Sequence, residues 1–197
     1  MNGILKTNQR TRTLAECAVM VALSTVLSLI RLWEAPLGGS VTLFSMVPII
    51  ALSYLRGVKP ALASAFACSV IQLLLGLGNV AYIPDPLGIV LCVVFDYLVP
   101  FTLLGLAAAL SKPLRNRTVS VLAGTLLVCL FRFACHVFVG GVVWYSLTKA
   151  GGWNDTVFRY GMWTYSAIYN AAFFVPETAL TLIGAPVVVS VGKRVVK

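Results

Sequence analysis

The sequence predicts an all-α integral membrane protein, a bundle of six transmembrane helices with both termini in the cytoplasm. Three observations lead to this prediction: the composition, the recurrence of long apolar stretches and the placement of the basic residues. Of the 197 residues, 59% are hydrophobic and only 11% are charged, and the mean hydropathy is +0.94. A soluble domain has about a quarter charged residues and under half apolar ones, so a soluble fold fits poorly.

Breaks at proline, glycine and charged residues divide the chain into six apolar segments, most of them near the roughly 20 residues that cross the hydrocarbon. The predicted helices span about 13–31, 41–55, 59–77, 87–110, 118–146 and 162–191. The second is short, so we expect it to be untilted or sheltered by its neighbours. No linker divides the chain, so residues 1–197 are predicted to form one domain. No A-x-A cleavage signature follows the first helix, and we expect that helix to be retained.

The basic residues predict the topology. Eleven of them share one side of the membrane if all six segments cross, and no acidic residue accompanies them in those loops. They are Lys6, Arg10, Arg12, Arg56, Lys59, Lys112, Arg115, Arg117, Lys193, Arg194 and Lys197. The opposite loops carry a balanced set: Arg31, Lys149, Arg159, Glu34, Asp85 and Asp155. By the positive-inside rule, both termini are cytoplasmic. Because the basic residues form short clusters instead of one basic face, the net charge of +9 does not indicate nucleic-acid binding.

The cysteines predict neither disulfides nor a metal site. Their number is odd, all lie inside apolar segments, and none has metal-ligand spacing. We expect Cys17, Cys68, Cys92, Cys129 and Cys135 to be small buried residues. No metal and no cofactor is predicted.

Polar side chains from three predicted helices lie at one depth. Counted from the outer helix ends at about 1.5 Å per residue, Asp96, His136 and Asn170 each lie roughly 12–15 Å below the outer surface. Tyr97 adjoins the acid, and Tyr165 lies about one and a half turns above the amide. Ionisable side chains inside a membrane are costly and usually face a cavity or a partner. The sequence therefore predicts a polar pocket in the outer half of the bundle.

A stripe on the fifth predicted helix adds to this pocket. Arg132 and His136 are spaced i, i+4 and share one face, which Gly140 and Trp144 continue toward the outside. One alternative is that Asp96 pairs with Arg132 and only locks two helices together.

Other aromatic and acidic residues have a simpler reading. Trp144, Trp153 and Trp163 lie near the outer interface, where an aromatic belt is expected. Glu16 and Glu177 are expected to serve helix packing and are not assigned to the pocket.

A carboxylate in a low-dielectric cavity favours a cation or a hydrogen-bond donor, and aromatic walls favour flat rings. The pocket therefore suits an aromatic, positively charged small molecule, or a neutral heterocycle. Catalysis is disfavoured because no nucleophile–base pair, metal-ligand triad or phosphate loop is visible. Two alternatives remain open: a small intramembrane enzyme using Asp96 and His136, and a purely structural membrane subunit.

Several ordered motifs across most of the chain are similar to one known family. The stretches are Gly38-Gly39-Ser40-Val41-Thr42 through Met46-Val47-Pro48-Ile49, Asp96-Tyr97-Leu98-Val99, Arg132-Phe133-Ala134-Cys135-His136-Val137 with Gly140 and Trp144, and Tyr165-Ser166-Ala167-Ile168-Tyr169-Asn170. The chain resembles the thiamine-specific substrate-binding subunits (S components, ThiT/YuaJ type) of energy-coupling-factor (ECF) vitamin transporters. An S component for another vitamin or precursor is the nearest alternative.

The resemblance implies a six-helix S-component fold in the cell membrane that binds thiamine near the extracellular side. The family's binding residues fall on Asp96, Tyr97, Arg132, His136, Gly140, Trp144, Tyr165 and Asn170, and more loosely on Tyr82. A pocket tryptophan found in the first outer loop of some members is offset here, at Trp33.

The resemblance also implies partners: an ECF transmembrane coupling subunit, two ATPase subunits and membrane lipid. The small residues Ala18 and Ala22, spaced i, i+4, would let the coupling subunit approach the first helix closely, although packing within this bundle is the alternative. The first outer loop, from Leu32 to Ser40, is expected to close over thiamine as a lid, with hinge freedom at its two adjacent glycines. The chain alone should bind but not pump.

Overall fold

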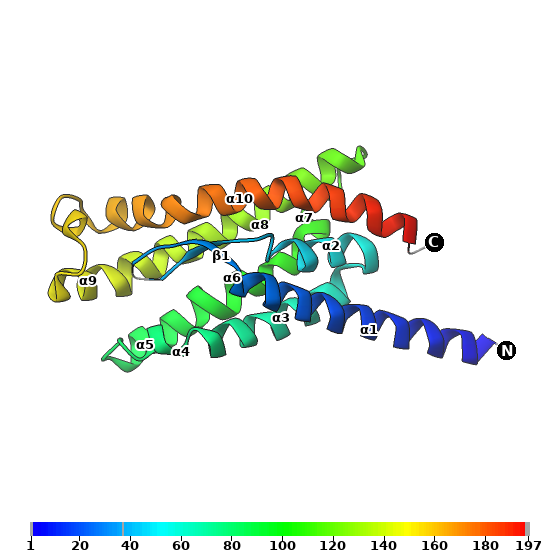
Figure 1. Ribbon diagram of the computed structural model, residues 1–197, viewed down its shortest axis with the longest axis horizontal. Helices are drawn as coiled ribbons and strands as arrows, with labels where there is room; N and C mark the ends of the chain where they lie inside the picture. The colour runs from blue at the N-terminus through cyan, green and yellow to red at the C-terminus, as the bar shows by residue number, and fades with distance from the viewer. Residues whose placement is uncertain (1, 37, 196–197) are drawn as a thin grey trace.

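Five long helical runs lie side by side in the computed structural model, which describes residues 2–36 and 38–195 (Figure 1). Lys197, one of the basic residues behind the topology prediction, and residues 1, 37 and 196 of the predicted domain lie outside this range. The runs are α1 (Asn2–Leu29); α3 (Val58–Leu75); α5 (Pro86–Cys92) with η1 (Val93–Leu98), α6 (Val99–Thr102), η2 (Leu103–Leu106) and α7 (Ala107–Leu110); α8 (Arg117–Val139) with η3 (Gly140–Trp144) and α9 (Tyr145–Gly151); and α10 (Met162–Val195).

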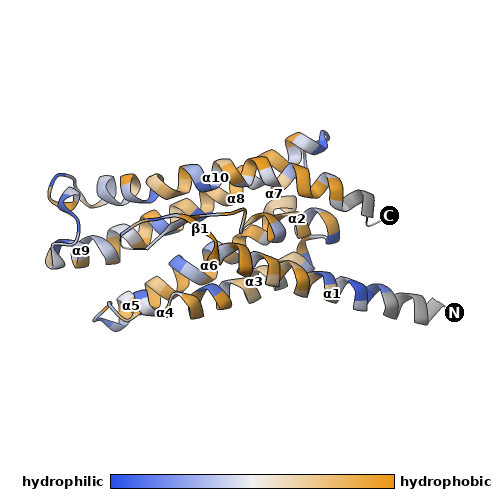
Figure 2. Cartoon of the chain, in the orientation of Figure 1, coloured by the Kyte–Doolittle hydropathy of each residue, from blue (hydrophilic) through white to orange (hydrophobic). Residues whose placement is uncertain are grey.

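Each run contains a stretch long and apolar enough to cross a membrane. Hydrophobic residues fill the middle of the runs, and hydrophilic residues gather toward the two ends of the bundle (Figure 2). The short elements α4 (Leu77–Val80) and η4 (Asp155–Phe158) lie in the connecting loops. The prediction of a mostly helical fold with several membrane-spanning helices is confirmed.

The segment between α1 and α3 differs from the prediction. Residues 31–34 and 40–42 form a two-stranded antiparallel hairpin, β1 (Arg31–Glu34) and β2 (Ser40–Thr42), where the sequence predicts the first outer loop and the adjoining edges of two helices. The next helix, α2 (Val47–Arg56), has only 10 residues instead of the predicted 41–55. At 1.5 Å per residue it is about 15 Å long, roughly half the hydrocarbon thickness. The fold is therefore mostly helical with one short hairpin, and α2 alone is too short to cross.

The hairpin completes the path that the short helix leaves unfinished. From the C-terminal end of α1, β1 runs on toward the end of the bundle that holds α4 and α9, and β2 returns to the start of α2 (Figure 1). We call that end the hairpin end and the opposite end, where α1 begins and α10 ends, the terminal end. β1 therefore extends the course of α1, and β2 precedes α2 on the return path.

The short helix α2 is the centre of the apolar core in the terminal half. Ile49, Ile50 and Ala51 are fully buried, and they pack with residues from α3, η2, α8 and α10. Pro48 lies in the first turn of α2, where backbone N–H groups have no partner within the helix, so its missing N–H costs no hydrogen bond. The apolar sequence of α2 thus reflects burial by the other helices on all sides, not exposure to lipid.

Two wide π-helical turns interrupt the long runs at one level of the bundle. They are η1, which carries Asp96 and Tyr97, and η3, which carries Gly140 and Trp144. A π turn closes an i→i+5 ring and so takes up an extra residue, and such turns are frequent at functional sites. The extra residue changes which side chains follow one another on the inner face of each run.

Glu16 has the packing role expected of it. Its carboxylate accepts hydrogen bonds from Arg56 and Arg12, which ties α1 to the end of α2. Cys68, Cys92 and Cys129 are buried, as predicted, whereas Cys17 and Cys135 are partly exposed, and all five are free thiols.

Ala18 and Ala22 are exposed on the side of α1 that faces away from the bundle. The alternative that they serve packing within this bundle is therefore wrong.

Candidate ligand-binding site

A cavity of about 380 Å³ lies in the hairpin half of the bundle. Its walls come from the end of α1, the β1–β2 hairpin, the end of α3, η1, α8 with η3, and α10. Eight of the nine side chains predicted for the pocket line it: Asp96, Tyr97, Arg132, His136, Gly140, Trp144, Tyr165 and Asn170. Helices distant in sequence therefore bring the predicted residues together around one space.

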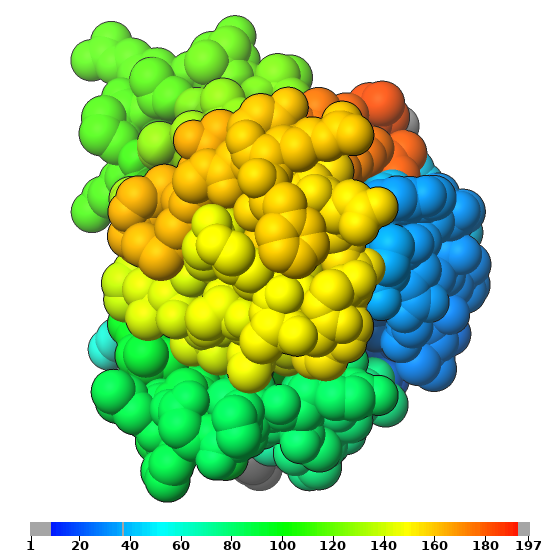
Figure 3. Space-filling view, turned by 90° about the vertical axis from the view of Figure 1, so that its left-hand side faces the viewer, coloured from blue at the N-terminus to red at the C-terminus, as the bar shows by residue number. Residues whose placement is uncertain are grey.

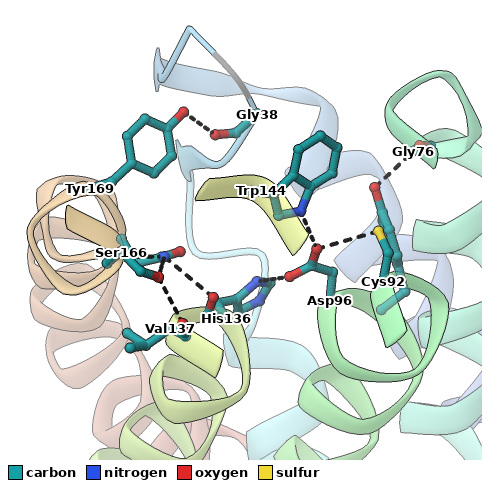
Figure 4. Close-up of polar contacts among 11 residues, drawn as sticks. Gly38, Gly76, Cys92, Asp96, His136, Val137, Trp144, Ser166 and Tyr169 are labelled. Carbon is teal, nitrogen blue, oxygen red and sulfur yellow. Dashed lines mark hydrogen bonds and ion pairs between the residues drawn. The ribbon is translucent and has the colours of Figure 1, made fainter. Parts of the chain in front are cut away.

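Asp96 is the centre of the polar contacts in this cavity (Figure 4). Its Oδ1 lies 2.9 Å from His136 Nδ1, and its Oδ2 accepts a hydrogen bond of 2.9 Å from Trp144 Nε1. The thiol of Cys92 donates to Oδ2 at 3.4 Å. One carboxylate thus orients both an imidazole and an indole against the cavity, and its two oxygens provide about four acceptor positions in all. Oδ1 retains capacity for a further donor.

The ion-pair alternative for Asp96 is wrong. Among the described residues, the Asp96 carboxylate pairs with the imidazole of His136 and not with Arg132. The Arg132 guanidinium instead lies over the ring of Phe101, 4.2 Å from its centroid, and 5.3 Å from that of Phe174. Its Nη1 contacts Met46 Sδ at 2.7 Å. Arg132 therefore brings a positive charge, held between aromatic faces, to the cavity wall.

Asn170 connects α10 to the helix that carries the imidazole. Its Nδ2 donates to Ser166 O at 2.9 Å and contacts His136 O at 3.4 Å. Ser166 Oγ donates to Val137 O at 2.7 Å. Gly140 makes this close approach possible, because a Cβ there would lie 2.9 Å from Asn170 Nδ2 and even closer to Ser166 Oγ.

Tyrosines form part of the cavity wall. Tyr97 donates to Gly76 O at 3.2 Å, and its ring leans over that glycine. Tyr165 is only 3% exposed and stacks with Tyr169, with ring centroids 6.0 Å apart. These contacts hold both predicted tyrosines in place against the cavity.

Tyr82 and Trp33 are not brought to this cavity. Tyr82 is 66% exposed and packs edge-on against Trp153 at the hairpin end, 5.9 Å between ring centroids. Trp33 is also exposed and borders a second, smaller hollow beyond Tyr165 and Tyr169. Neither side chain is among those that line the main cavity.

The hairpin covers the cavity from the hairpin end. Gly38 O accepts a hydrogen bond of 3.0 Å from Tyr169 Oη, and Gly39 lies against the ring of Phe173. On the other side, a Cβ on Gly38 would be 3.1 Å from Asn79 Nδ2 on α4. Both glycines have positive φ, 90° and 88°, so a side chain there would be strained as well as crowded.

Three segments form the face of the molecule at the hairpin end (Figure 3). Residues around 145–165 lie at its centre, between the hairpin on one side and residues around 80–95 on the other. Two of these segments also line the cavity, through Gly38 and Gly39 of the hairpin and through Thr148 and Tyr165.

Sequence reasoning identified only one member of a row of four cavity residues on α10. Tyr165, Tyr169, Phe173 and Glu177 are spaced by four and all line the cavity. The spacing from the predicted Tyr165 is the signal that could have found the other three. Glu177, predicted only for packing, is 4% exposed and accepts hydrogen bonds from the backbone and side chain of Thr42.

The site is equipped for recognition. It combines a carboxylate, an imidazole, a guanidinium and several aromatic faces in a space whose volume falls within the range of about 300–1,000 Å³ typical of small-molecule pockets. Within residues 2–36 and 38–195, no group of three His, Cys, Asp or Glu side chains could hold a metal ion.

Comparisons with known proteins agree with this geometry. Residues 14–197 match the family model described as thiamine transporter protein (Thia_YuaJ). The thiamine transporter ThiT of Bacillus subtilis is 30% identical over 175 residues, which is 83% of each chain. The ThiT of Lacticaseibacillus paracasei is 26% identical over 161 residues, 77% of this chain and 74% of the relative.

A solved structure of ThiT from Listeria monocytogenes has the same fold. It matches with a TM-score of 0.69 at 19% sequence identity, over 95% of this chain and 98% of that one. The family is one of transporters and not of enzymes, so the intramembrane-enzyme alternative is excluded. The chain belongs to the thiamine transporter (Thia_YuaJ) family and is a multi-pass protein of the cell membrane.

Proposed function

We propose that this chain is a thiamine-binding S component, which captures the vitamin from outside in the 380 Å³ cavity and delivers it through an ATP-driven ECF complex. The observation that carries the proposal is the Asp96 carboxylate, which holds His136 and Trp144 against the cavity of a thiamine-transporter family member. The proposed contacts are the eight cavity residues named above. Tyr82 is left out because it lies away from the cavity.

Thiamine has two flat rings, an aminopyrimidine and a positively charged thiazolium. The negative charge of Asp96 favours the cation, and its Oδ1 has room to accept a further N–H donor. The imidazole of His136 and the indole of Trp144 offer flat faces for stacking. The cation also benefits from the π faces around it.

The proposed orientation places the hairpin end outside and both termini in the cytoplasm. The positive-inside rule supports it, because the basic loops lie at the terminal end. Six passages through the membrane then arise from five long helices and one composite passage, in which β2 and α2 follow each other. Residues 1–197 act as one domain in this arrangement.

The proposed partners are the ECF transmembrane coupling subunit, two ATPase subunits and membrane lipid. The exposed small residues Ala18 and Ala22 on α1 leave room for a helix of the coupling subunit to approach closely.

Thiamine titration of the purified chain tests the proposal. Because Trp144 lies in the cavity, bound thiamine should quench tryptophan fluorescence, and Trp144→Phe should remove most of that quenching. A thermal-shift screen against other vitamins and thiamine precursors serves as the specificity control. Stabilisation by another vitamin, with none by thiamine, would assign the chain to a different ligand, and no ligand effect at all would favour a structural subunit.

A further inference from the structure

The base of the hairpin is held by the buried carboxylate of Glu177, which lines the cavity but is not among the eight proposed ligand contacts. Glu177 Oε2 accepts a hydrogen bond of 2.6 Å from Thr42 N, and Oε1 accepts one of 2.7 Å from Thr42 Oγ1. Ser45 Oγ adds a longer contact of 3.4 Å to Oε1. Thr42, Ser45 and Glu177 are 5%, 7% and 4% exposed, so the whole group is shielded from water.

These contacts satisfy a backbone that has left regular structure inside the membrane. Non-helical backbone at membrane depth is tolerated only where its polar groups find partners or line a cavity. Between Thr42 and Ser45 the chain turns from β2 into α2, and Phe44 has a φ of 60°, an uncommon conformation for a residue other than glycine. Such a conformation persists only where its surroundings hold it, and here Glu177 bonds to a residue on either side of it.

The same row of α10 residues holds the hairpin along its length. Glu177 bonds Thr42, Phe173 packs against Gly39, and Tyr169 donates to Gly38 O. The contact at Glu177 combines a carboxylate acceptor with two short hydrogen bonds, to the backbone and to the side chain of Thr42, and hydrogen bonds to a carboxylate are the stronger kind. Release of the base would free the strand that covers the cavity.

We infer that Glu177 is a positioning residue for ligand retention. It clamps the base of the β1–β2 hairpin to α10, so that the hairpin stays closed over bound ligand and the ligand dissociates slowly. The inference rests on the proposed function of the cavity. It assigns to Glu177 an effect on the dissociation rate through the hairpin and no required contact with the ligand.

A pair of matched substitutions tests the clamp. Thr42→Val removes the hydroxyl that bonds Glu177, whereas Thr181→Val removes an equally buried hydroxyl one turn further along α10 that bonds only the backbone oxygen of Glu177. Stopped-flow tryptophan fluorescence should show thiamine dissociating about tenfold faster from Thr42→Val, as expected for loss of one hydrogen bond to a charged group, with little change in the association rate. Thr181→Val should dissociate thiamine at the wild-type rate.

Substitutions of the acid itself separate the clamp from a direct charge contact. Glu177→Leu removes every hydrogen bond and should raise the dissociation rate further than Thr42→Val. Glu177→Gln keeps an acceptor for Thr42 N and a donor for Thr42 Oγ1, although both bonds become neutral, and it should dissociate thiamine clearly more slowly than Glu177→Leu. If Glu177→Gln is as impaired as Glu177→Leu, the carboxylate charge acts on the ligand directly and the clamp is refuted.

Hydrogen exchange of the ligand-free protein gives a readout that does not depend on thiamine. Peptides covering residues 31–45 should exchange faster in Thr42→Val than in wild type or Thr181→Val, because the hairpin opens more often. Equal exchange and equal dissociation rates for both threonine variants would overturn the inference, even if Glu177→Leu fails to fold. Failure of wild type to bind thiamine would instead refute the proposed function, and the exchange experiment would still decide on the clamp.

Discussion

Replacing Asp96 is the most informative perturbation of the cavity, because its carboxylate bonds the imidazole of His136, the indole of Trp144 and the thiol of Cys92. In Asp96→Ala, His136 Nδ1 and Trp144 Nε1 both lose their acceptor, and neither ring remains oriented. A hydrogen bond to a charged group contributes about 1.5–3 kcal/mol, and a buried donor left unpaired costs a similar amount. If even one such contact is lost from the thiamine-bound state, the affinity for thiamine should decrease by well over tenfold.

Asp96→Asn separates orientation from charge. The amide retains one oxygen as an acceptor for Trp144 Nε1 and offers an N–H to the other tautomer of His136, so the rings should keep their positions. What disappears is the negative charge, and a pair of unit charges about 7 Å apart in an effective dielectric of about 20 interacts by on the order of 2 kcal/mol. Asp96→Asn should therefore weaken thiamine binding about 30-fold, less than Asp96→Ala does.

The assay is a fluorescence titration of each variant with thiamine and with a neutral analogue in which carbon replaces the charged ring nitrogen. Asp96→Asn should reduce the affinity for thiamine much more than that for the neutral analogue, whereas Asp96→Ala should reduce both. Equal losses for the two ligands in Asp96→Asn would show that the carboxylate acts only by orienting its neighbours. Wild-type affinity in both variants would refute the assignment of the site.

Three further predictions concern packing around the cavity. Gly140→Ala should lower thiamine affinity more than tenfold, because the new methyl group forces α8 and α10 apart, whereas Gly161→Ala, where a Cβ meets nothing within 4 Å, should bind normally in the same titration. Tyr82→Ala should change thiamine affinity less than twofold, since the side chain is 66% exposed and outside the cavity. A large loss of affinity would show that Tyr82 does belong to the binding site. Tyr169→Phe removes the hydroxyl that bonds Gly38 O, and stopped-flow measurements should show thiamine dissociating several-fold faster, with unchanged dissociation arguing against hairpin closure.

The placement of the main site residues could be predicted from sequence because helices have a regular rise. Asp96, His136 and Asn170 were predicted at one depth by counting residues, and all three line one cavity. The stripe from His136 through Gly140 to Trp144 also holds, although a regular helix would drift over eight residues and the π turn η3 intervenes. Sequence spacing does not reveal such a turn, because it arises from packing between helices.

The hairpin could not be predicted in the same way. Residues 31–34 and 40–42 are short and carry charged and polar side chains, as loops do, and their strand geometry comes from pairing with each other and from contacts with α10. The role of Glu177 was missed for a related reason. A single acid in an apolar helix is compatible with packing, and only the fold shows that its partner is the backbone of Thr42, 135 positions away in sequence.

Local composition and periodicity are sufficient to predict a membrane protein, its long apolar helices, the clustering of basic residues and the level at which polar side chains enter the bundle. Contacts between distant segments can be identified only in the folded bundle. Those contacts include the partner of Asp96, the strands that replace part of a helix, and the carboxylate that holds their base. Helix formation and membrane insertion depend on residues that are neighbours in sequence. Hydrogen bonds inside the bundle instead depend on which donors and acceptors the packed helices bring within about 3 Å of each other.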